Sequence, residues 1–225
     1  MIGVTAPTYV QPTGIEYDRF QHVEPAQVEK LKKRLKIKDE TVFVSVSRLS
    51  NEKNIDFMID ALAELKKNTD KAFRLLIVGD GHQKQRLQAK IDELGLTETI
   101  QLVGSVAPEN MANWYQLGDA FLFASQSETQ GMVILEAMAA GLPVVAVRSS
   151  GIDDVVEDGF NGYKTPAKQA VWLERVERIL NDESLRKELS DNAESFAKAY
   201  SVERFSQDVR HIYAETLARY HEAKN

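Results

Sequence analysis

Short apolar runs alternate with amphipathic segments along most of the chain. The runs contain few polar residues and lie at 41–47, 73–79, 99–104, 119–125 and 143–149. Segments with helical periodicity separate them, at 54–68, 82–94, 108–117 and 131–141. Strands that are apolar almost throughout are typical of a parallel sheet covered on both faces. Because crossovers between parallel strands are right-handed, the pattern predicts a doubly wound, Rossmann-like α/β sheet.

After residue 165 the pattern predicts helices only. They are expected over 167–180, 182–198 and 201–222, where they would form a helical C-terminal tail rather than a second sheet.

The first part of the chain has a different character. Pro7, Pro12 and Gly14 precede the first predicted helix, near 25–35, and indicate an extended segment. The expected organisation is a linker over 1–20 followed by a single domain over 21–225. Because a lone domain with such a leading segment resembles half of a larger arrangement, we expect the chain to be a fragment of a longer enzyme.

The composition narrows the classes of function. Lys and Arg number 28 against 34 Asp and Glu, and the formal net charge of −6 argues against a nucleic-acid binder. The chain has no cysteine, which excludes disulfides, thiolate zinc sites and cysteine nucleophiles, and its four histidines show no metal-ligand spacing. Residues 1–14 do not resemble a signal peptide, and no apolar run is long enough to span a membrane. We therefore expect a cytoplasmic protein.

The segment SQSETQGMVILEAMAAGLPVVA, over 125–146, carries the strongest chemical signal. It predicts a turn at Gly131 after a buried strand and then a short helix that ends at Gly141. Such a turn at the carboxyl end of a parallel sheet presents free backbone N–H groups, which suit a diphosphate. Glu128, in the loop or first turn, and Glu136, within the helix, would accept hydrogen bonds from sugar hydroxyls. Their spacing favours recognition of an elongated ligand over hydrolysis by paired acids.

A purely structural role for the two glutamates remains open on spacing alone. An acid near a helix N-terminus often only complements the helix dipole, and Glu136 could be a solvated helix residue. Glu136 is flanked by apolar residues, however, and a buried carboxylate needs a partner. That surrounding favours a functional role for Glu136.

Two cations follow the first predicted strand, in the sequence SRLSNEKN. Arg48 and Lys53 could grip one diphosphate from two sides, Arg48 bidentately and Lys53 as a point charge. The alternative is a surface loop with a solvated Glu52–Lys53 pair.

Two further strand-end loops are less specific. Gly79 and Gly81 begin a dinucleotide fingerprint, but its third glycine is replaced by Lys84, so an NAD oxidoreductase is disfavoured. The loop at Val106 could present its backbone to a base edge, or it could be a plain connection.

A basic stripe precedes the first strand. Most such stripes are solvated helix faces; the alternative is attraction to an anionic membrane surface. Its residues are Lys30, Lys32, Lys33, Arg34, Lys36 and Lys38.

Five segments resemble, in this order, the C-terminal domain of the group 1 glycosyltransferases, a retaining family with two facing Rossmann-like domains (the GT-B fold). The segments are PTGIEYDRF, SRLSNEKN, GDG with LVGSV, SETQGMVILEAMAAGLPVVA, and GIDDVVEDGFNG at 151–162. The resemblance covers nearly the whole chain and implies that the family's N-terminal acceptor domain is absent from it. The Thr-Gln-Gly version at 129–131 is similar to that of diacylglycerol glucosyltransferases.

The resemblance implies a role for each matched position. Arg48 and Lys53 would bind the donor diphosphate and stabilise the leaving nucleotide, Glu128 would lie near the transferred hexose, and Glu136 would bind the ribose hydroxyls. Arg48, Lys53 and Glu128 would be the catalytic residues, and Val106 would contact the base. No metal or cofactor is implied. Backbone contacts to sugar and phosphate would come from Thr129, Gln130, Gly131, Met132 and Val133.

The expected function is transfer of glucose from UDP-glucose, with retention, to an acceptor such as diacylglycerol at the inner face of the membrane. The isolated chain is expected to bind the donor but to transfer little or nothing. One alternative is a sugar-nucleotide epimerase of the same fold, which would lack the two-glutamate segment found here. The other is a non-catalytic nucleotide-sugar-binding module, disfavoured because Arg48, Lys53, Glu128 and Glu136 are all present.

Overall fold

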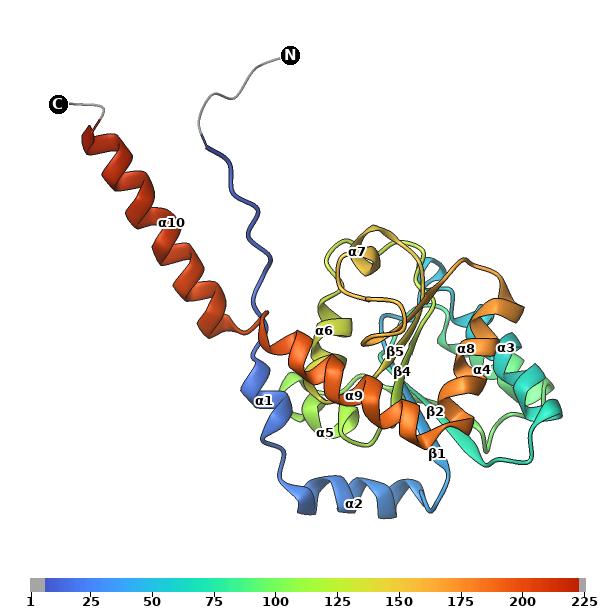
Figure 1. Cartoon of the computed structure of the whole chain (residues 1–225). Coiled ribbons are helices and arrows are strands. Elements are labelled where there is room, and N and C mark those ends of the chain that lie inside the picture. The colour runs from blue at the N-terminus through green and yellow to red at the C-terminus, as the bar shows by residue number, and fades with distance from the viewer. Residues whose placement is uncertain (1–6, 223–225) are drawn as a thin grey trace.

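The computed structural model describes residues 7–222 and contains a six-stranded, all-parallel sheet (Figure 1). The order of the strands is β3-β2-β1-β4-β5-β6, so the chain reverses direction across the sheet between β1 and β4, as in a doubly wound fold. The strands are β1 (Thr41–Val46), β2 (Phe73–Val78), β3 (Ile100–Gly104), β4 (Ala120–Phe123), β5 (Val144–Val147) and β6 (Gly162–Thr165).

The five strands predicted from apolar runs are all present, and the predicted fold class is confirmed. Strand β6 was not predicted, because its four residues include a single large apolar side chain, that of Tyr163. Its place beside β5 depends on close backbone packing. A Cβ atom on Gly162 would lie 2.2 Å from the carbonyl oxygen of Val144, so only glycine fits there.

Helices cover both faces of the sheet. One face carries α1 (Tyr17–Gln21), α2 (Pro25–Leu35), α5 (Met111–Tyr115), α6 (Met132–Ala139) and α9 (Glu183–Lys198). The other face carries α3 (Ile55–Asn68), α4 (Lys84–Glu93) and α8 (Gln169–Asn181). The short helices η1 (Asn51–Lys53), η2 (Pro108–Asn110) and α7 (Ser150–Asp153) lie in loops.

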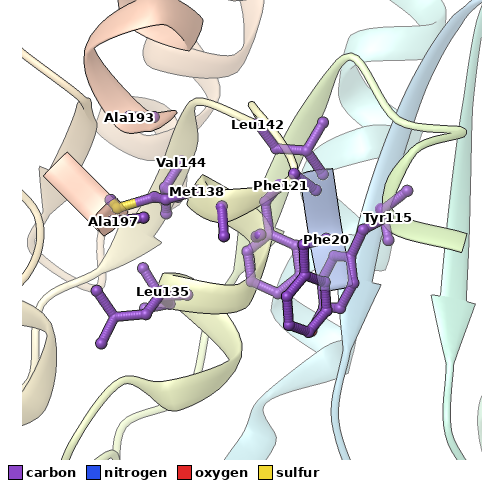
Figure 2. Packing of buried hydrophobic residues seen from close by; sticks show 14 of the residues in the cluster. Phe20, Tyr115, Phe121, Leu135, Met138, Leu142, Val144, Ala193 and Ala197 are labelled. Atoms are coloured by element: carbon purple, nitrogen blue, oxygen red, sulfur yellow. The ribbon is translucent and has the colours of Figure 1, made fainter. Parts of the chain in front are cut away.

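The first of these faces has an aromatic core that reaches from α1 to the sheet. Phe20 of α1 meets Tyr115 edge-on with ring centroids 5.6 Å apart, and Tyr115 in turn lies 5.9 Å from Phe121 of β4. Figure 2 shows these rings together, with Leu135 and Met138 of α6 beside them. Each such side chain contributes about 1.5–3 kcal/mol by leaving water. Helix α1 is therefore packed as part of the domain.

The segments through which the chain enters and leaves the domain meet near Ile15 and Ser201. Ile15 forms a β-bridge with Ser201, and Gly14 lies against the start of α10 (Val202–Glu222). From there α10 extends away from the rest of the domain (Figure 1). Residues 1–6 of the predicted linker and 223–225 of the predicted domain lie outside the described residues.

Candidate functional site

The loops that follow β1, β2 and β3 enclose a cleft of about 410 Å³ at the carboxyl edge of the sheet. This edge, next to the reversal of strand order, is where open α/β sheets bind their ligands. Three predicted site residues line the cleft: Arg48, Val106 and Glu136. The other lining residues are Val46, Ser47, Val78, Gly79, Asp80, Ser105 and Met111.

Two glycines allow the loop after β2 to contact the loop after β1 beside this cleft. A Cβ on Gly79 would stand 1.9 Å from the carbonyl oxygen of Ser47, and one on Gly81 would stand 2.4 Å from that of Leu49. Any larger residue would push the loop after β2 away from the loop after β1. The sequence GDG thus brings two strand-end backbones together at the cleft.

Lys53 does not pair with its neighbour Glu52 but with Glu128, which is distant in sequence. Its Nζ lies 3.2 Å from Glu128 Oε2, and both side chains are about 15% exposed. The ammonium also lies 5.6 Å from the centre of the Phe123 ring, at the end of β4. Strand β4 is the neighbour of β1, so this pair joins the two strand ends at which the sheet reverses.

The loop that carries Glu128 is held by its own carboxylate. Oε1 of Glu128 accepts the backbone N–H groups of Thr129 and Gly131, each at 3.3 Å. Gly131 then begins α6 with a φ of +66°, a conformation that favours glycine. Its missing side chain matters too, because a Cβ there would stand 2.9 Å from the carbonyl oxygen of Gly151.

The other residues predicted to make backbone contacts follow this turn or form part of it. Thr129 and Gln130 are exposed, whereas Met132 and Val133 form the half-buried first turn of α6. First-turn N–H groups have no partner within a helix, so they suit an anionic ligand. Glu128 itself lies in the loop and Glu136 in the helix, so the two never share a helical face.

Arg48 is placed very differently from Lys53. Its side chain is 78% exposed and pairs with Glu52 at 3.3 Å. The Ser50 hydroxyl, which donates to Glu52 at 2.6 Å, is the main cause that lowers the pKa of that carboxyl, and Arg48 lowers it too. Arg48 precedes helix η1 and lines the cleft, whereas Lys53 is the last residue of η1 and is paired with Glu128.

Glu136 points from α6 into the cleft, and its partner is a residue that sequence reasoning missed. The Tyr115 hydroxyl donates to Glu136 Oε2 at 2.9 Å. Burial raises the pKa of the Glu136 carboxyl, while the tyrosine hydrogen bond and Arg19 lower it. The pKa of Tyr115 is raised well above its ordinary value, first by complete burial and then by the adjacent carboxylate.

A larger hollow, of about 630 Å³, lies between α2, β3 and α5. It shares only Ser105 and Val106 with the cleft and contains neither glutamate nor Lys53. We assign the site to the smaller cleft because it lies at the strand ends and is lined by Arg48 and Glu136; Lys53 and Glu128 lie outside the lining of both hollows. Within residues 7–222, no group of three or more His, Asp or Glu side chains is arranged to hold a metal ion.

The sequence model of the family described as "Glycosyl transferases group 1" matches residues 27–196. An alpha-monoglucosyldiacylglycerol synthase of Acholeplasma laidlawii is 33% identical over 209 residues, 92% of this chain and 52% of that protein. An enzyme of the same name from Streptococcus pneumoniae is 36% identical over 68% of this chain and 35% of its own length.

Among solved structures, the Anabaena protein HepE in complex with UDP-glucose is 28% identical, with a TM-score of 0.79. The match covers 92% of this chain and 56% of HepE. The chain therefore spans about half the length of this protein and of the Acholeplasma relative.

Proposed function

The chain belongs to the group 1 glycosyltransferases, and from this membership we propose that it binds the nucleotide-sugar donor of a hexosyl transfer. The observation that carries the proposal is the meeting of Arg48, Val106 and Glu136 around one cleft at the carboxyl edge of the sheet. A cation, an exposed loop backbone and a carboxylate are the groups needed for a diphosphate, a base and a ribose.

The leaving group would be stabilised beside this cleft. As the bond from sugar to diphosphate breaks, negative charge grows on the phosphate oxygens, where Arg48, Lys53 and the first turn of α6 supply positive potential. Lys53 is held by Glu128 at 3.2 Å, so a diphosphate would compete with that carboxylate for the ammonium. Glu128, once released, would be free to bind hydroxyls of the hexose.

We assign UDP-glucose as the donor and retention of the anomeric configuration as the outcome. The support for the donor is that HepE, similar over 92% of this chain, binds UDP-glucose. The support for a lipid acceptor such as diacylglycerol is the name of two relatives, alpha-monoglucosyldiacylglycerol synthase. Because the chain spans about half of the first of these, we expect the groups that bind the acceptor in the half it does not match.

Helix α2 supports a peripheral position at an anionic membrane surface. Five cations of the basic stripe are exposed: Lys30, Lys33, Arg34, Lys36 and Lys38. Each cation near such a surface contributes about 1 kcal/mol to binding. Over residues 7–222 no helix is long and apolar enough to span a bilayer. Co-sedimentation with phosphatidylserine vesicles, compared with neutral vesicles, tests this part of the proposal.

Calorimetric titration of UDP into the chain tests the donor site. We expect binding with a dissociation constant between about 1 μM and 1 mM, the usual range for enzyme ligands. The absence of heat at millimolar UDP would overturn the proposal.

Two arginine variants make this titration specific. Arg48→Ala should weaken UDP binding at least tenfold, which corresponds to about 1.4 kcal/mol. Arg204→Ala is the matched control, because Arg204 is also exposed and pairs with an acid four residues on, Asp208, but lies on α10. Equal affinities for both variants would argue against a diphosphate at Arg48.

A further inference from the structure

Tyr115 is completely buried, and its hydroxyl contacts a residue that lines the donor cleft, Glu136. Its side chain is 0% exposed, and its hydroxyl lies 2.9 Å from Glu136 Oε2 and 3.4 Å from the carbonyl oxygen of Val133. The shorter contact shows that the hydroxyl proton is directed at the carboxylate. A hydroxyl buried in an aromatic core has little freedom to move, so it fixes whatever it binds.

The ring of Tyr115 is held from two sides. Phe20 of α1 meets it edge-on at 5.6 Å, and Phe121 of β4 lies at 5.9 Å (Figure 2). The chain beside it is also tied down, since the Gln116 side chain donates to the carbonyl oxygen of Phe20 at 2.8 Å. Helix α1 and strand β4 together set the position of the hydroxyl, and the hydroxyl sets the position of Glu136.

The two carboxylate oxygens of Glu136 therefore have different partners. Oε2 is taken by Tyr115, so Oε1 is the oxygen that remains for a ligand. Without an anchor, a glutamate on a helix surface samples several rotamers and loses that freedom on binding. An anchored carboxylate has already given up this entropy, which makes binding tighter.

We infer that Tyr115 is a positioning residue of the donor site, which holds Glu136 in the orientation that accepts the ribose hydroxyls, with Phe20 of α1 keeping the tyrosine ring in place. The inference rests on the proposed donor function and adds two residues to it. It also makes donor affinity sensitive to the packing of α1, the helix through which the chain enters the domain.

The charges around Glu136 come from three directions. Arg19 and Glu16 face it from α1, and Arg48 and Asp80 line the same cleft from the ends of β1 and β2. The Tyr115 hydrogen bond lowers the pKa of Glu136, so its removal raises that pKa. Since the ionised carboxylate is the better acceptor for ribose hydroxyls, the variant should lose UDP affinity at a higher pH than the natural protein as the solution is acidified.

The test is Tyr115→Phe, which keeps the ring and removes only the hydroxyl. We expect UDP binding to weaken about tenfold, whereas binding of 2′,3′-dideoxyuridine diphosphate, which lacks the ribose hydroxyls, should change less than twofold. Tyr17→Phe is the matched control. Tyr17 is also buried, packs from α1, and donates its hydroxyl to a glutamate, Glu194 at 3.4 Å, away from the cleft.

A second substitution shows whether the effect passes through the carboxylate. In Glu136→Ala, adding Tyr115→Phe should cause no further loss of UDP affinity, because no side-chain acceptor remains for Tyr115 to position. Should Tyr115→Phe fail to fold, Phe20→Leu loosens the ring without removing the hydroxyl. It should weaken UDP binding, about threefold, and leave the dideoxy compound unaffected.

The outcomes separate the inference from the function on which it rests. If the natural protein does not bind UDP, the proposed function fails and the inference fails with it. If the natural protein binds UDP and Tyr115→Phe binds UDP equally well with the same pH dependence, the donor function stands and the inference is overturned. Equal weakening for UDP and for the dideoxy compound also overturns it, because that result means general damage.

Discussion

The two glutamates of the site are held by opposite kinds of contact. Glu128 lies in an irregular loop and is fixed by charge: Lys53 at one oxygen and backbone N–H groups at the other. Glu136 lies within a regular helix and is fixed by a neutral hydroxyl, that of Tyr115, which belongs to the hydrophobic core. Another anion can displace Glu128 from Lys53, but it cannot displace Glu136 from the Tyr115 hydroxyl.

Because of this difference, the Glu136 side of the proposed donor site is expected to be rigid and the Glu128 side to rearrange. A diphosphate offers Lys53 a stronger partner than Glu128, so the loop around Glu128 is the part expected to rearrange when a donor arrives. Nothing in a nucleotide competes for the Tyr115 hydroxyl in its aromatic surroundings. In the proposed site, Glu136 would therefore provide a fixed reference for the ribose, while the Glu128 side would adapt to the sugar.

The largest expected effect comes from removing the charge that holds Glu128. Lys53→Ala takes away a proposed phosphate ligand and leaves a carboxylate that is only 15% exposed without its cation. We expect a loss of about 2–3 kcal/mol in the free energy of unfolding and a comparable loss in UDP binding. Chemical denaturation and calorimetry measure the two quantities.

Arg74→Ala is the control for this variant. Arg74 pairs with Glu40 at 2.9 Å, with similarly small exposure, at the amino end of β2. It should cost similar stability and leave UDP binding unchanged. If both variants weaken UDP binding equally, Lys53 acts only through stability.

The next effect concerns the backbone of the Glu128 loop. Gly131→Ala forces a side chain into a φ of +66° and places its Cβ 2.9 Å from the Gly151 carbonyl oxygen. We expect a destabilisation of about 2 kcal/mol. Gly95→Ala has a φ of +68° but open space around it, so it should cost only about 1 kcal/mol. A thermal unfolding scan of both variants gives the difference, and equal losses would mean that the contact with Gly151 contributes nothing.

Glu136→Gln should separate stability from binding. In the folded protein burial raises the pKa of Glu136, so between the ordinary glutamate pKa and this raised value only the folded state holds the proton. Stability therefore falls as the pH rises through that window and stays lower above it. The variant cannot ionise, so it should melt at a higher temperature than the natural protein at neutral pH, yet bind UDP about tenfold more weakly.

The pH supplies the internal control for this prediction. Below the ordinary glutamate pKa the natural carboxyl is protonated in both the folded and the unfolded state, so the stabilising effect of the substitution should vanish. Melting temperatures recorded across the pH range would contradict the assignment if the variant were less stable throughout.

The smallest expected effect is a gain in UDP affinity rather than a loss. Glu128→Gln removes the carboxylate that competes with a diphosphate for Lys53, so UDP should bind more tightly, about threefold to fivefold. Glu52→Gln, next to Arg48 but exposed, should change affinity by less than twofold. Weaker UDP binding by Glu128→Gln would show that the carboxylate organises the loop more than it opposes the ligand.

Most of the fold could be predicted because buried parallel strands leave a simple trace. Strands β1 to β5 are apolar almost throughout, and the Gly-Pro signals around Gly141 and Pro143 fixed the end of α6 to within two residues. Strand β6 and helices α1 and α7 escaped prediction. They are four or five residues long, and their positions depend on close contacts such as that of Gly162 with β5 rather than on periodicity.

The sequence named the candidate site residues but not the contacts that they make. The order of motifs identified Arg48, Lys53, Glu128 and Glu136, yet spacing along the chain said nothing about Lys53 reaching across to Glu128. The demand of a buried carboxylate for a donor did point to an unidentified partner of Glu136. Its identity as Tyr115, 21 positions away on another helix, required the packing of α5 against α6.

Helix α10 is expected to be much less stable than the sheet. None of its residues between Val202 and His221 is buried, so little tertiary packing supports it, and a helix of 21 residues alone in water is only marginally stable. Its amide hydrogens should exchange with solvent through local fraying, at rates set by a far smaller free energy than those of β1 or β4. The sheet can therefore stay protected from hydrogen exchange while the terminal helix opens and closes.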